Sequence, residues 1–494
     1  MKHFGRNKVG RRWFALGLLC VAQFVVVLDA TIVAIALPEI QRDLGFSRAG
    51  LQWVISAYTL VFGGFLLLAG RAADLWGRRR LFMIGLVVFT GASLACGLAG
   101  SPLALLLGRI AQGLGAAIVA PSALSSLTAA FPEGEGRGRA LGVWTAAAAG
   151  GGATGWLLGG VLTGSLGWEW VFLVNLPVGI LGVALAPVLV SESRDEAAPP
   201  RLDVAGAVSV TAGLTLLVYG ITRVEEAGLG APVTLVSLTS SVVLLGLFVV
   251  VEGRVRHPLV PLGVFRSRVL LGANLIALVL TAATTPPMLL CTLYVQQVLG
   301  FPPAQAGLIF PPFNLAVIGG SLLGPRLVAR FGPRTTMACG LLAIAAGSAC
   351  LLGMSPHGGG YLLYLVPAFV LMGSGLGCAS VASTTSGTTA ADGNLQGLAS
   401  GLLNSAAQIG TVLGLAILVP LSAARTETLT ETIPPDAALV EGFKLAFLGA
   451  VLISACGIAI ATLLTRQKHK QNTPSAEAPY NSTPASPKAD KLKC

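Results

Sequence analysis

Long apolar runs recur along almost the whole chain, separated by short polar segments that are rich in arginine. A membrane-spanning helix needs about 20 apolar residues, and fourteen runs come close to that length or exceed it. Their continuity favours helices over barrel strands, because backbone groups in lipid must be paired within each segment. The expected spans are residues 13–37, 51–69, 81–99, 103–130, 140–162, 168–190, 203–221, 231–251, 270–293, 304–323, 335–354, 361–390, 398–420 and 441–465.

Basic residues are concentrated in every second connection between these runs. Residues 1–12 carry five Lys and Arg, and four arginines lie between the eighth and ninth runs, within residues 254–268. The positive-inside rule places such segments on the cytoplasmic side. We therefore expect both termini in the cytoplasm, an even number of spans, and a location in the inner or plasma cell membrane.

Composition agrees with a membrane protein. Charged residues make up 11% of the chain and hydrophobic residues 54%, with a mean hydropathy of +0.80, whereas soluble domains carry about 25% charged residues. The net charge of +11 could suggest nucleic-acid binding, but its placement between apolar runs is a topology signal. The expected surroundings are a lipid bilayer, with no nucleic-acid partner.

Glycine spacing indicates an internal repeat. Gly151 in the fifth run matches Gly410 in the thirteenth, and residues 113–115 of the fourth run match residues 375–377 of the twelfth. Two similar six-helix halves with two extra helices between them would account for fourteen spans, and duplicated halves are the usual build of secondary transporters. Chance matching in a glycine-rich chain is the alternative.

This repeat predicts an all-α membrane protein with five parts. They are a cytoplasmic N-terminus (1–12), an N-terminal six-helix bundle (13–190), a linker with two additional transmembrane helices (191–269), a C-terminal six-helix bundle (270–465) and a disordered cytoplasmic tail (466–494).

The connection between the second and third runs, residues 70–80 (GRAADLWGRRR), sets one acid among four arginines and two glycines, Gly70 and Gly77. Asp74 can pair with an arginine such as Arg78 or cap a neighbouring helix N-terminus. A pair that forms in one conformation and breaks in another would act as a cytoplasmic gate. Ordinary topogenic charge is the alternative, and it explains the arginines but neither Asp74 nor the glycines.

Asp29 is the only acid well inside an apolar run. Such a residue normally faces the bundle interior or a cavity, and burial disfavours its charged form, which moves proton uptake toward working pH. A proton that crosses 100 mV gains about 2.3 kcal/mol, enough to drive an uphill exchange. Our hypothesis is that Asp29 binds the coupling proton, a cationic substrate, or each in turn; the alternative is a structural acid.

Arg109 is the only basic residue deep inside a run. Its match in the repeat is the apolar Leu371, so helix geometry does not demand an arginine there. We expect Arg109 to tune protonation nearby or to hold a polar network across the bundle, with a purely structural pairing as the alternative.

Several of these segments resemble the major facilitator superfamily. Residues 70–80 resemble its loop signature G-x-x-x-D-x-x-G-R-R/K, and residues 109–115 (RIAQGLG) resemble its fourth-helix R-x-x-Q-G-x-G. Residues 28–38 (LDATIVAIALP) resemble the first helix of the fourteen-helix drug:proton antiporters, and residues 168–177 resemble their sixth-helix opening. The resemblance spans nearly the whole membrane domain and implies a multidrug or antibiotic efflux transporter.

The fifth run contains GGATGWLLGG (151–160), which resembles the antiporter motif G-x-x-x-G-P-x-x-G-G of the same family. Its motif glycines are Gly151, Gly155, Gly159 and Gly160. These glycines can form a close-packing, bendable face, but Trp156 stands where the motif has proline, so the fixed kink is lost. Ala34 and Glu169 are smaller departures in the first and sixth helices.

Further polar and aromatic residues are candidates for lining an amphipathic pocket. They are Trp144, Trp156, Phe313, Asn314, Asn404 and Gln408. Ordinary packing between helices is the alternative for each of them.

The expected function is proton-coupled efflux of small hydrophobic, drug-like or antibiotic molecules, cationic or uncharged, by rocking two halves around a midplane site. The chain has no Walker A loop, histidine pair or nucleophile elbow, so we expect no enzyme activity, cofactor or metal site. The proton gradient would supply the energy, and a monomer would suffice. The alternative is an importer of a small metabolite on the same fold; a membrane receptor would carry a sizeable soluble domain, which the sequence lacks.

Overall fold

The computed structural model describes most of the chain, and every regular element in it is helical. The described residues are 2–131, 135–194, 202–228, 230–255, 258–356, 361–389 and 396–464. The predicted tail 466–494 lies outside them. The elements are α1 (Lys2–Leu44), α2 (Arg48–Leu51), α3 (Trp53–Trp76), α4 (Arg78–Gly97), α5 (Pro102–Ala130), α6 (Glu135–Leu166), α7 (Trp170–Leu173), α8 (Asn175–Leu189), α9 (Val204–Ala227), α10 (Pro232–Arg254), η1 (Leu262–Arg266), α11 (Arg268–Leu293), η2 (Tyr294–Val298), α12 (Pro303–Gly307), α13 (Pro311–Cys350), η3 (Leu351–Gly353), α14 (Tyr361–Thr389), α15 (Gln396–Thr430) and α16 (Pro435–Leu464).

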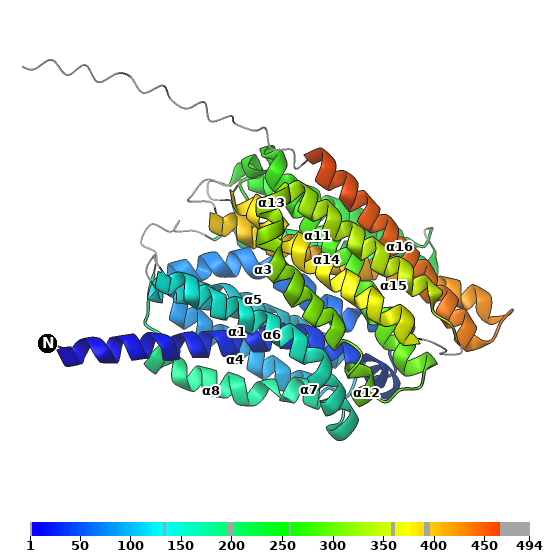
Figure 1. Ribbon diagram of the computed structural model, residues 1–494, viewed down its shortest axis with the longest axis horizontal. Coiled ribbons are helices and arrows are strands. Elements are labelled where there is room, and N and C mark those ends of the chain that lie inside the picture. Colours follow the sequence, from blue (N-terminus) through cyan, green and yellow to red (C-terminus); the bar gives the residue numbers. More distant parts are fainter. Residues whose placement is uncertain are drawn as a thin grey trace, which may run out of the picture.

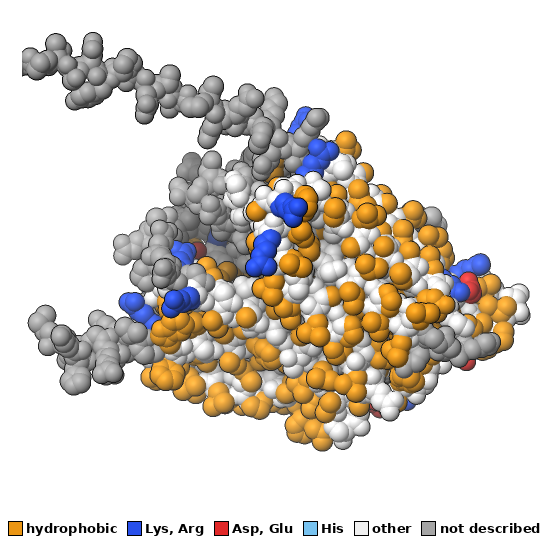
Figure 2. All heavy atoms as spheres, in the orientation of Figure 1, with side chains coloured by type: hydrophobic (Ala, Val, Ile, Leu, Met, Phe, Trp, Pro, Cys, Tyr) orange, Lys and Arg blue, Asp and Glu red, His pale blue; other side chains and the backbone are white. Residues whose placement is uncertain are grey.

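Within the described ranges, twelve helices are long and apolar enough to cross a membrane. Figure 2 shows hydrophobic side chains over the middle of one face, with Lys and Arg near its ends. This is the surface expected of a protein whose sides contact lipid tails. α6 is not among the twelve, because its many glycines lower its mean hydropathy. It nevertheless packs against α1, which is itself long enough to span the membrane.

α13 is a hairpin of two helices that meet at Gly332. Its 40 residues would extend about 60 Å as one straight helix, twice the thickness of the hydrocarbon layer. Gly332 has φ 81° and ψ 160°, a conformation that glycine adopts without steric cost. A Cβ at Gly320 would touch Ser374 and one at Gly340 would touch Gly375. Because these partners are adjacent in α14, the two arms of α13 lie at one level and the chain reverses between them.

Helix boundaries extend further than the apolar pattern predicts. α1 starts at Lys2 and continues through Pro38 to Leu44, whereas the sequence predicts a span over 13–37. The predicted sixth span, 168–190, is divided into α7 and α8 with a break at Val174. Polar residues at helix ends carry no apolar signal, so the pattern records the part in contact with lipid or core and not the whole helix.

The labelled helices form two groups (Figure 1). α1 to α8 pack among themselves, as do α11 to α16, while α9 packs on α10 and contacts both α3 and α15. We call the end where α1 begins and α16 ends the termini end, and the other the opposite end. At the opposite end the two groups meet where α6 packs against α12.

Glycines at close helix–helix contacts show which positions of the first group of helices match which positions of the second. Gly151 packs on the backbone of α1 at Phe24, and Gly410 packs on the backbone of α11 at Leu278, so this predicted match is confirmed.

The other predicted match, of residues 113–115 with 375–377, is wrong by two residues. Gly113 packs on the backbone of α3 at Tyr58, and the glycine in the same position on the first arm of α13 is Gly373, which packs at Phe313. A run of alternating small residues in α14 offers several registers in sequence, and the helix contacts select one.

Candidate functional site

Asp29 lies inside the first group of helices and has no exposed surface. Its Oδ2 accepts a hydrogen bond from Arg109 Nη1 at 2.6 Å. Its Oδ1 accepts from Gln112 Nε2 at 2.7 Å and from Asn175 Nδ2 at 2.8 Å. Donors from α5 and α8 thus converge on one carboxylate of α1, which compensates for taking its charge out of water.

Arg109 is also fully buried and is held in place on several sides. Besides Asp29, Nη1 donates to Gln112 Oε1 at 2.7 Å, and Nε donates to the carbonyl of Val54 in α3 at 2.9 Å. The guanidinium carbon lies 4.3 Å from the ring centre of Tyr58 and 5.7 Å from that of Phe172. These aromatic faces favour a cation, so Arg109 connects α1, α3, α5 and α7 through a single charge.

Ser93 completes the network from α4. Its Oγ accepts from Gln112 Nε2 at 2.8 Å and from Asn175 Nδ2 at 3.4 Å. The side-chain oxygen of Asn175 is buried with no hydrogen-bond partner, so the network retains one free acceptor. The sequence alone does not predict Gln112, Asn175 or Ser93 as members of the network around Asp29. Gln112 and Asn175 stand in the quoted motif segments, but a serine within an apolar run gives no signal of its own.

The second group of helices replaces this ion pair with apolar residues. In the register set by Gly113 and Gly373, the counterpart of Arg109 is Phe369. The predicted counterpart, Leu371, is therefore wrong by two residues. Phe369 packs on Phe313, as Arg109 packs on Tyr58.

The remaining positions of the network follow the same register. Gln112 corresponds to Met372, and Ser93 to Ser348, whose hydroxyl donates to the Met372 sulfur at 3.9 Å. At these corresponding positions, only the first half carries a buried charge, so the repeated helix packing does not by itself require one.

The loop of the gate motif turns at Gly77, where φ is 105°. Arg78 donates to Asp74 Oδ1 through Nε at 3.0 Å and Nη2 at 2.8 Å. Glu192 accepts the backbone N–H groups of Arg79 and Arg80 at 3.1 and 3.2 Å, and so caps the N-terminus of α4. Of the two interactions expected for Asp74, this conformation contains the arginine pair.

Gly70 lies about two helical turns before Gly77, and a Cβ there would approach Pro121 of α5 at 3.5 Å, an ordinary contact. Gly70 is therefore not required for close packing in this conformation.

The glycines of the fifth-run motif pack against two different helices, α1 and α12. Cβ atoms at Gly151, Gly155 and Gly159 would overlap α1 between Phe24 and Ile32. A Cβ at Gly160 would lie 2.5 Å from the carbonyl oxygen of Pro303 in α12. Three glycines thus hold α6 on α1 within one half, and the fourth allows the two halves to touch.

Trp156, which stands where the motif has proline, also takes part in the contact between the two halves. Its ring stacks on Phe310 with ring centroids 4.1 Å apart and an interplanar angle of 18°, and Phe310 stacks on Phe369 at 5.2 Å. Trp156 is 7% exposed. The tryptophan therefore extends the aromatic cluster of the second half into the first.

The predicted pocket residues are divided between different environments. Phe313 is buried in the aromatic cluster, and Asn314 donates to the Phe310 carbonyl at 3.5 Å. Asn404 is exposed and accepts from the partly exposed Gln408 at 3.3 Å. Trp144 is partly buried against the core of the first half. These side chains do not form one cluster in this conformation.

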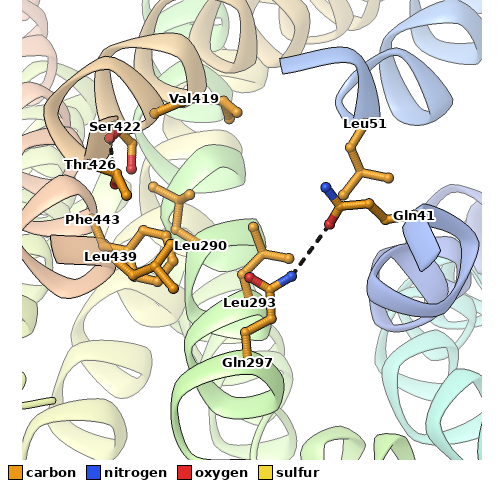
Figure 3. A pocket seen from close by; sticks show the side chains of 11 residues that line it. Gln41, Leu51, Leu290, Leu293, Gln297, Val419, Ser422, Thr426, Leu439 and Phe443 are labelled. Atoms are coloured by element: carbon orange, nitrogen blue, oxygen red, sulfur yellow. Dashed lines mark hydrogen bonds between the residues drawn. The ribbon is translucent and has the colours of Figure 1, made fainter. Parts of the chain in front are cut away.

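A small hollow lies at the opposite end between α1, α11, α15 and α16 (Figure 3). Gln297 Nε2 donates to Gln41 Oε1 at 3.4 Å across it. Nearby, Gln296 Nε2 donates to the carbonyl of Ile35 at 2.9 Å. None of the predicted pocket residues lines this hollow, and its polar contacts help to join the two halves.

The chain matches one protein family over most of its length. The model of the Major Facilitator Superfamily matches residues 19–415. The chain belongs to this superfamily. It is 39% identical to the puromycin resistance protein pur8 of Streptomyces alboniger, over 97% of the chain and 96% of that protein. It is 42% identical to the cephamycin export protein CmcT of Amycolatopsis lactamdurans, over 85% of the chain and 88% of that protein.

Solved structures of two transporters share the fold. A bacterial homolog of the human lysosomal transporter Spinster, in an inward-facing and unoccupied conformation, aligns with a TM-score of 0.64 at 20% identity, covering 92% of this chain and 97% of the other. The POT family transporter PepTSo aligns with a TM-score of 0.66 at 14% identity, covering 91% of this chain and 98% of the other. Membership of the Major Facilitator Superfamily, together with twelve described helices that are long and apolar enough to span a membrane, makes this protein a multi-pass membrane transporter and not an enzyme.

Proposed function

We propose that this transporter exports hydrophobic drug-like or antibiotic molecules in exchange for protons, by alternating access. Relatives named for puromycin resistance and cephamycin export support export over the import of a small metabolite. The observation that carries the proton-coupled mechanism is the fully buried pair of Asp29 and Arg109.

The geometry of that pair supports a two-state mechanism. With Arg109 and two amides donating to it, Asp29 is stabilised as a carboxylate in this conformation. A proton on Asp29 would remove the attraction for Arg109, and an unpaired buried charge costs about 3–5 kcal/mol. Arg109 would then have to find other partners, so proton binding and rearrangement of α1 against α5 are linked. Proton entry drives the change of state in this mechanism.

The contacts between the halves support a conformation closed at the opposite end. Gly160 on Pro303, Trp156 on Phe310 and Gln297 on Gln41 all lie there. By the positive-inside rule the termini end faces the cytoplasm, so this state is closed to the outside. Substrate would enter from the cytoplasm beside Asn404, whose polar side chain would be costly to expose to lipid.

We further propose fourteen spans. They are the twelve apolar helices, α6, which runs beside α1, and a second span in the hairpin α13. The same reasoning divides the chain into bundles at 13–190 and 270–465, with α9 and α10 in the linker 191–269. The protein would act as a monomer in the cell membrane, with both termini in the cytoplasm.

The proposed exchange is tested by efflux from cells. A drug-sensitive bacterial strain that expresses the protein is loaded with puromycin or a fluorescent hydrophobic cation, and retention is compared with a vector control. Expressing cells are expected to retain less, and an uncoupler is expected to remove the difference, because the proton gradient supplies the energy. Greater accumulation in expressing cells, or efflux that survives the uncoupler, contradicts the proposal.

Gly160→Ala tests the contact between the halves. The added methyl group would meet the Pro303 carbonyl, whereas the same change at Gly164 places a methyl 3.5 Å from Ala304, an ordinary contact. Overpacking costs about 1–3 kcal/mol, so Gly160→Ala should slow efflux by about tenfold, while Gly164→Ala should match the wild type. Initial efflux rates at equal protein amount measure this; equal rates for the two variants would show that the contact does not limit transport.

A further inference from the structure

Two buried acids meet at the termini end, outside the network of Asp29. Asp203 precedes α9 and is 5% exposed, and Glu252 near the end of α10 is 3% exposed. Asp203 Oδ1 accepts the backbone N–H of Gly206 at 2.7 Å, and Glu252 Oε2 accepts that of Val260 at 3.1 Å. Each acid thus uses one oxygen to fix a local backbone turn.

The other oxygen of each acid is buried without a hydrogen-bond partner. A Cβ on Gly206 would lie 2.7 Å from Asp203 Oδ2 and 2.9 Å from Glu252 Oε1. The two unpaired oxygens therefore converge on one point above a glycine. Two acceptors that approach each other away from water repel unless something between them donates.

The charges around the pair are unequal. Arg71, at the beginning of the gate loop, interacts electrostatically with both acids and donates to the Leu259 carbonyl at 3.5 Å. The charged groups that act on Glu252 are Asp203 and Arg71. Among the described residues, two carboxylates face one guanidinium here, and an excess of negative charge in a buried place is costly.

We propose that Glu252 holds a proton that it donates to Asp203, and that the two acids form a second proton-binding site, distinct from Asp29. A protonated carboxyl carries one O–H donor, so a single proton gives each unpaired oxygen a partner and cancels the excess charge. A metal cation would need about six oxygen ligands, and the described part of the chain places two unpaired carboxylate oxygens here. Asp203 caps α9, whose N-terminus favours an anion, so the proton resides on Glu252.

This site lies where the extra helices join both halves. The segment with Leu259 and Val260 packs with Ala207 of α9, Leu402 of α15 and Phe65 of α3. Loss of the Glu252 proton would place two negative charges that repel each other inside this junction. The packing of α9 and α10 against the gate-loop end of α3 would then be weaker. Proton occupancy at the termini end would in this way control how firmly the linker helices are docked.

Infrared spectroscopy of the purified full-length protein in lipid tests the site without measuring transport. Wild type at neutral pH is expected to show a protonated-carboxyl band that shifts in D₂O. Glu252→Gln should lose this band, and Asp203→Asn should lose it as well, because Glu252 then pairs with Arg71 as a carboxylate. Glu427→Gln, at an exposed acid of α15, should keep it.

Thermal unfolding gives a second measurement on the same samples. Deprotonation of the shared site should lower the melting temperature of the wild type as pH rises, and Glu252→Gln should lack this component relative to Glu427→Gln. Glutamine can still accept from Val260, so the variant keeps that contact. A carboxyl band that is unchanged in both Glu252→Gln and Asp203→Asn, or no such band from acidic to neutral pH, overturns the proposal.

Discussion

Asp29→Asn is expected to reduce efflux to the level of the vector control. Asparagine cannot carry the coupling proton, and it leaves the charge of Arg109 without its anionic partner in a site that has no exposed surface. An unpaired buried charge costs about 3–5 kcal/mol, so folding is expected to suffer as well as transport. Retention of substrate in energised cells and the monodisperse yield in detergent measure these two losses separately.

The double variant Asp29→Asn/Arg109→Gln separates a coupling role from a structural one. It removes both charges together, so the folded yield should recover, as replacing a buried ion pair by neutral groups is often tolerated. Efflux against a gradient should not recover. Asp436→Asn, at an exposed acid of α16, serves as the matched control. Full recovery of efflux in the double variant would mean that Asp29 has only a structural role.

Gly151→Leu is expected to prevent folding of the first half. A Cβ at this position would overlap the carbonyl oxygen of Phe24 and lie 3.2 Å from the backbone nitrogen of Leu28. Backbone of a packed helix cannot move aside as a side chain can, and small residues are what permit such close approach in membranes. We expect a loss of at least about 3 kcal/mol, the upper range for overpacking.

Gly142→Leu is the matched control on the same helix, because a Cβ at Gly142 meets nothing within 4 Å. Size-exclusion profiles of fluorescent fusions should show little monodisperse protein for Gly151→Leu and a profile like the wild type for Gly142→Leu. Similar profiles for the two variants would show that α6 does not need its close approach to α1.

The sequence predicts the polar centre only in part. A single charged residue in an apolar run needs a partner, so the sequence predicts Asp29 and Arg109 as candidates without showing that they touch. Ser93 and Asn175 lie in the same network but are small neutral residues, and such residues also occur in ordinary helix packing. Their role follows only from which helix faces meet.

The sequence predicts one match of the internal repeat correctly and places the other match two residues away from its true position. Gly151 and Gly410 have the same spacing to neighbouring glycines, which the sequence displays directly. The correspondence of Gly113 with Gly373 depends on which backbone each glycine touches, and α14 has glycines at every second position from 373 to 377. The reversal at Gly332 likewise depends on one backbone conformation within a continuous helical pattern.

Trp156 marks the clearest departure from the family motif, and the structure gives it a physical role. Proline at this place would bend α6, whereas tryptophan places a large flat ring against Phe310. Stacked aromatic pairs contribute about 0.5–1.5 kcal/mol beyond the area they bury. The closed contact between the halves thus depends on stacking where the motif would supply a kink.

Proton movement in reconstituted vesicles tests the ion pair at position 29 most directly. Purified protein is placed in sealed liposomes with a pH dye inside, and a hydrophobic cationic substrate is added outside without an imposed gradient. Wild type should move protons when substrate is added, and Asp29→Asn/Arg109→Gln, folded but neutral, should move none while still equilibrating substrate. Substrate-driven proton movement of wild-type size in that double variant would contradict the account.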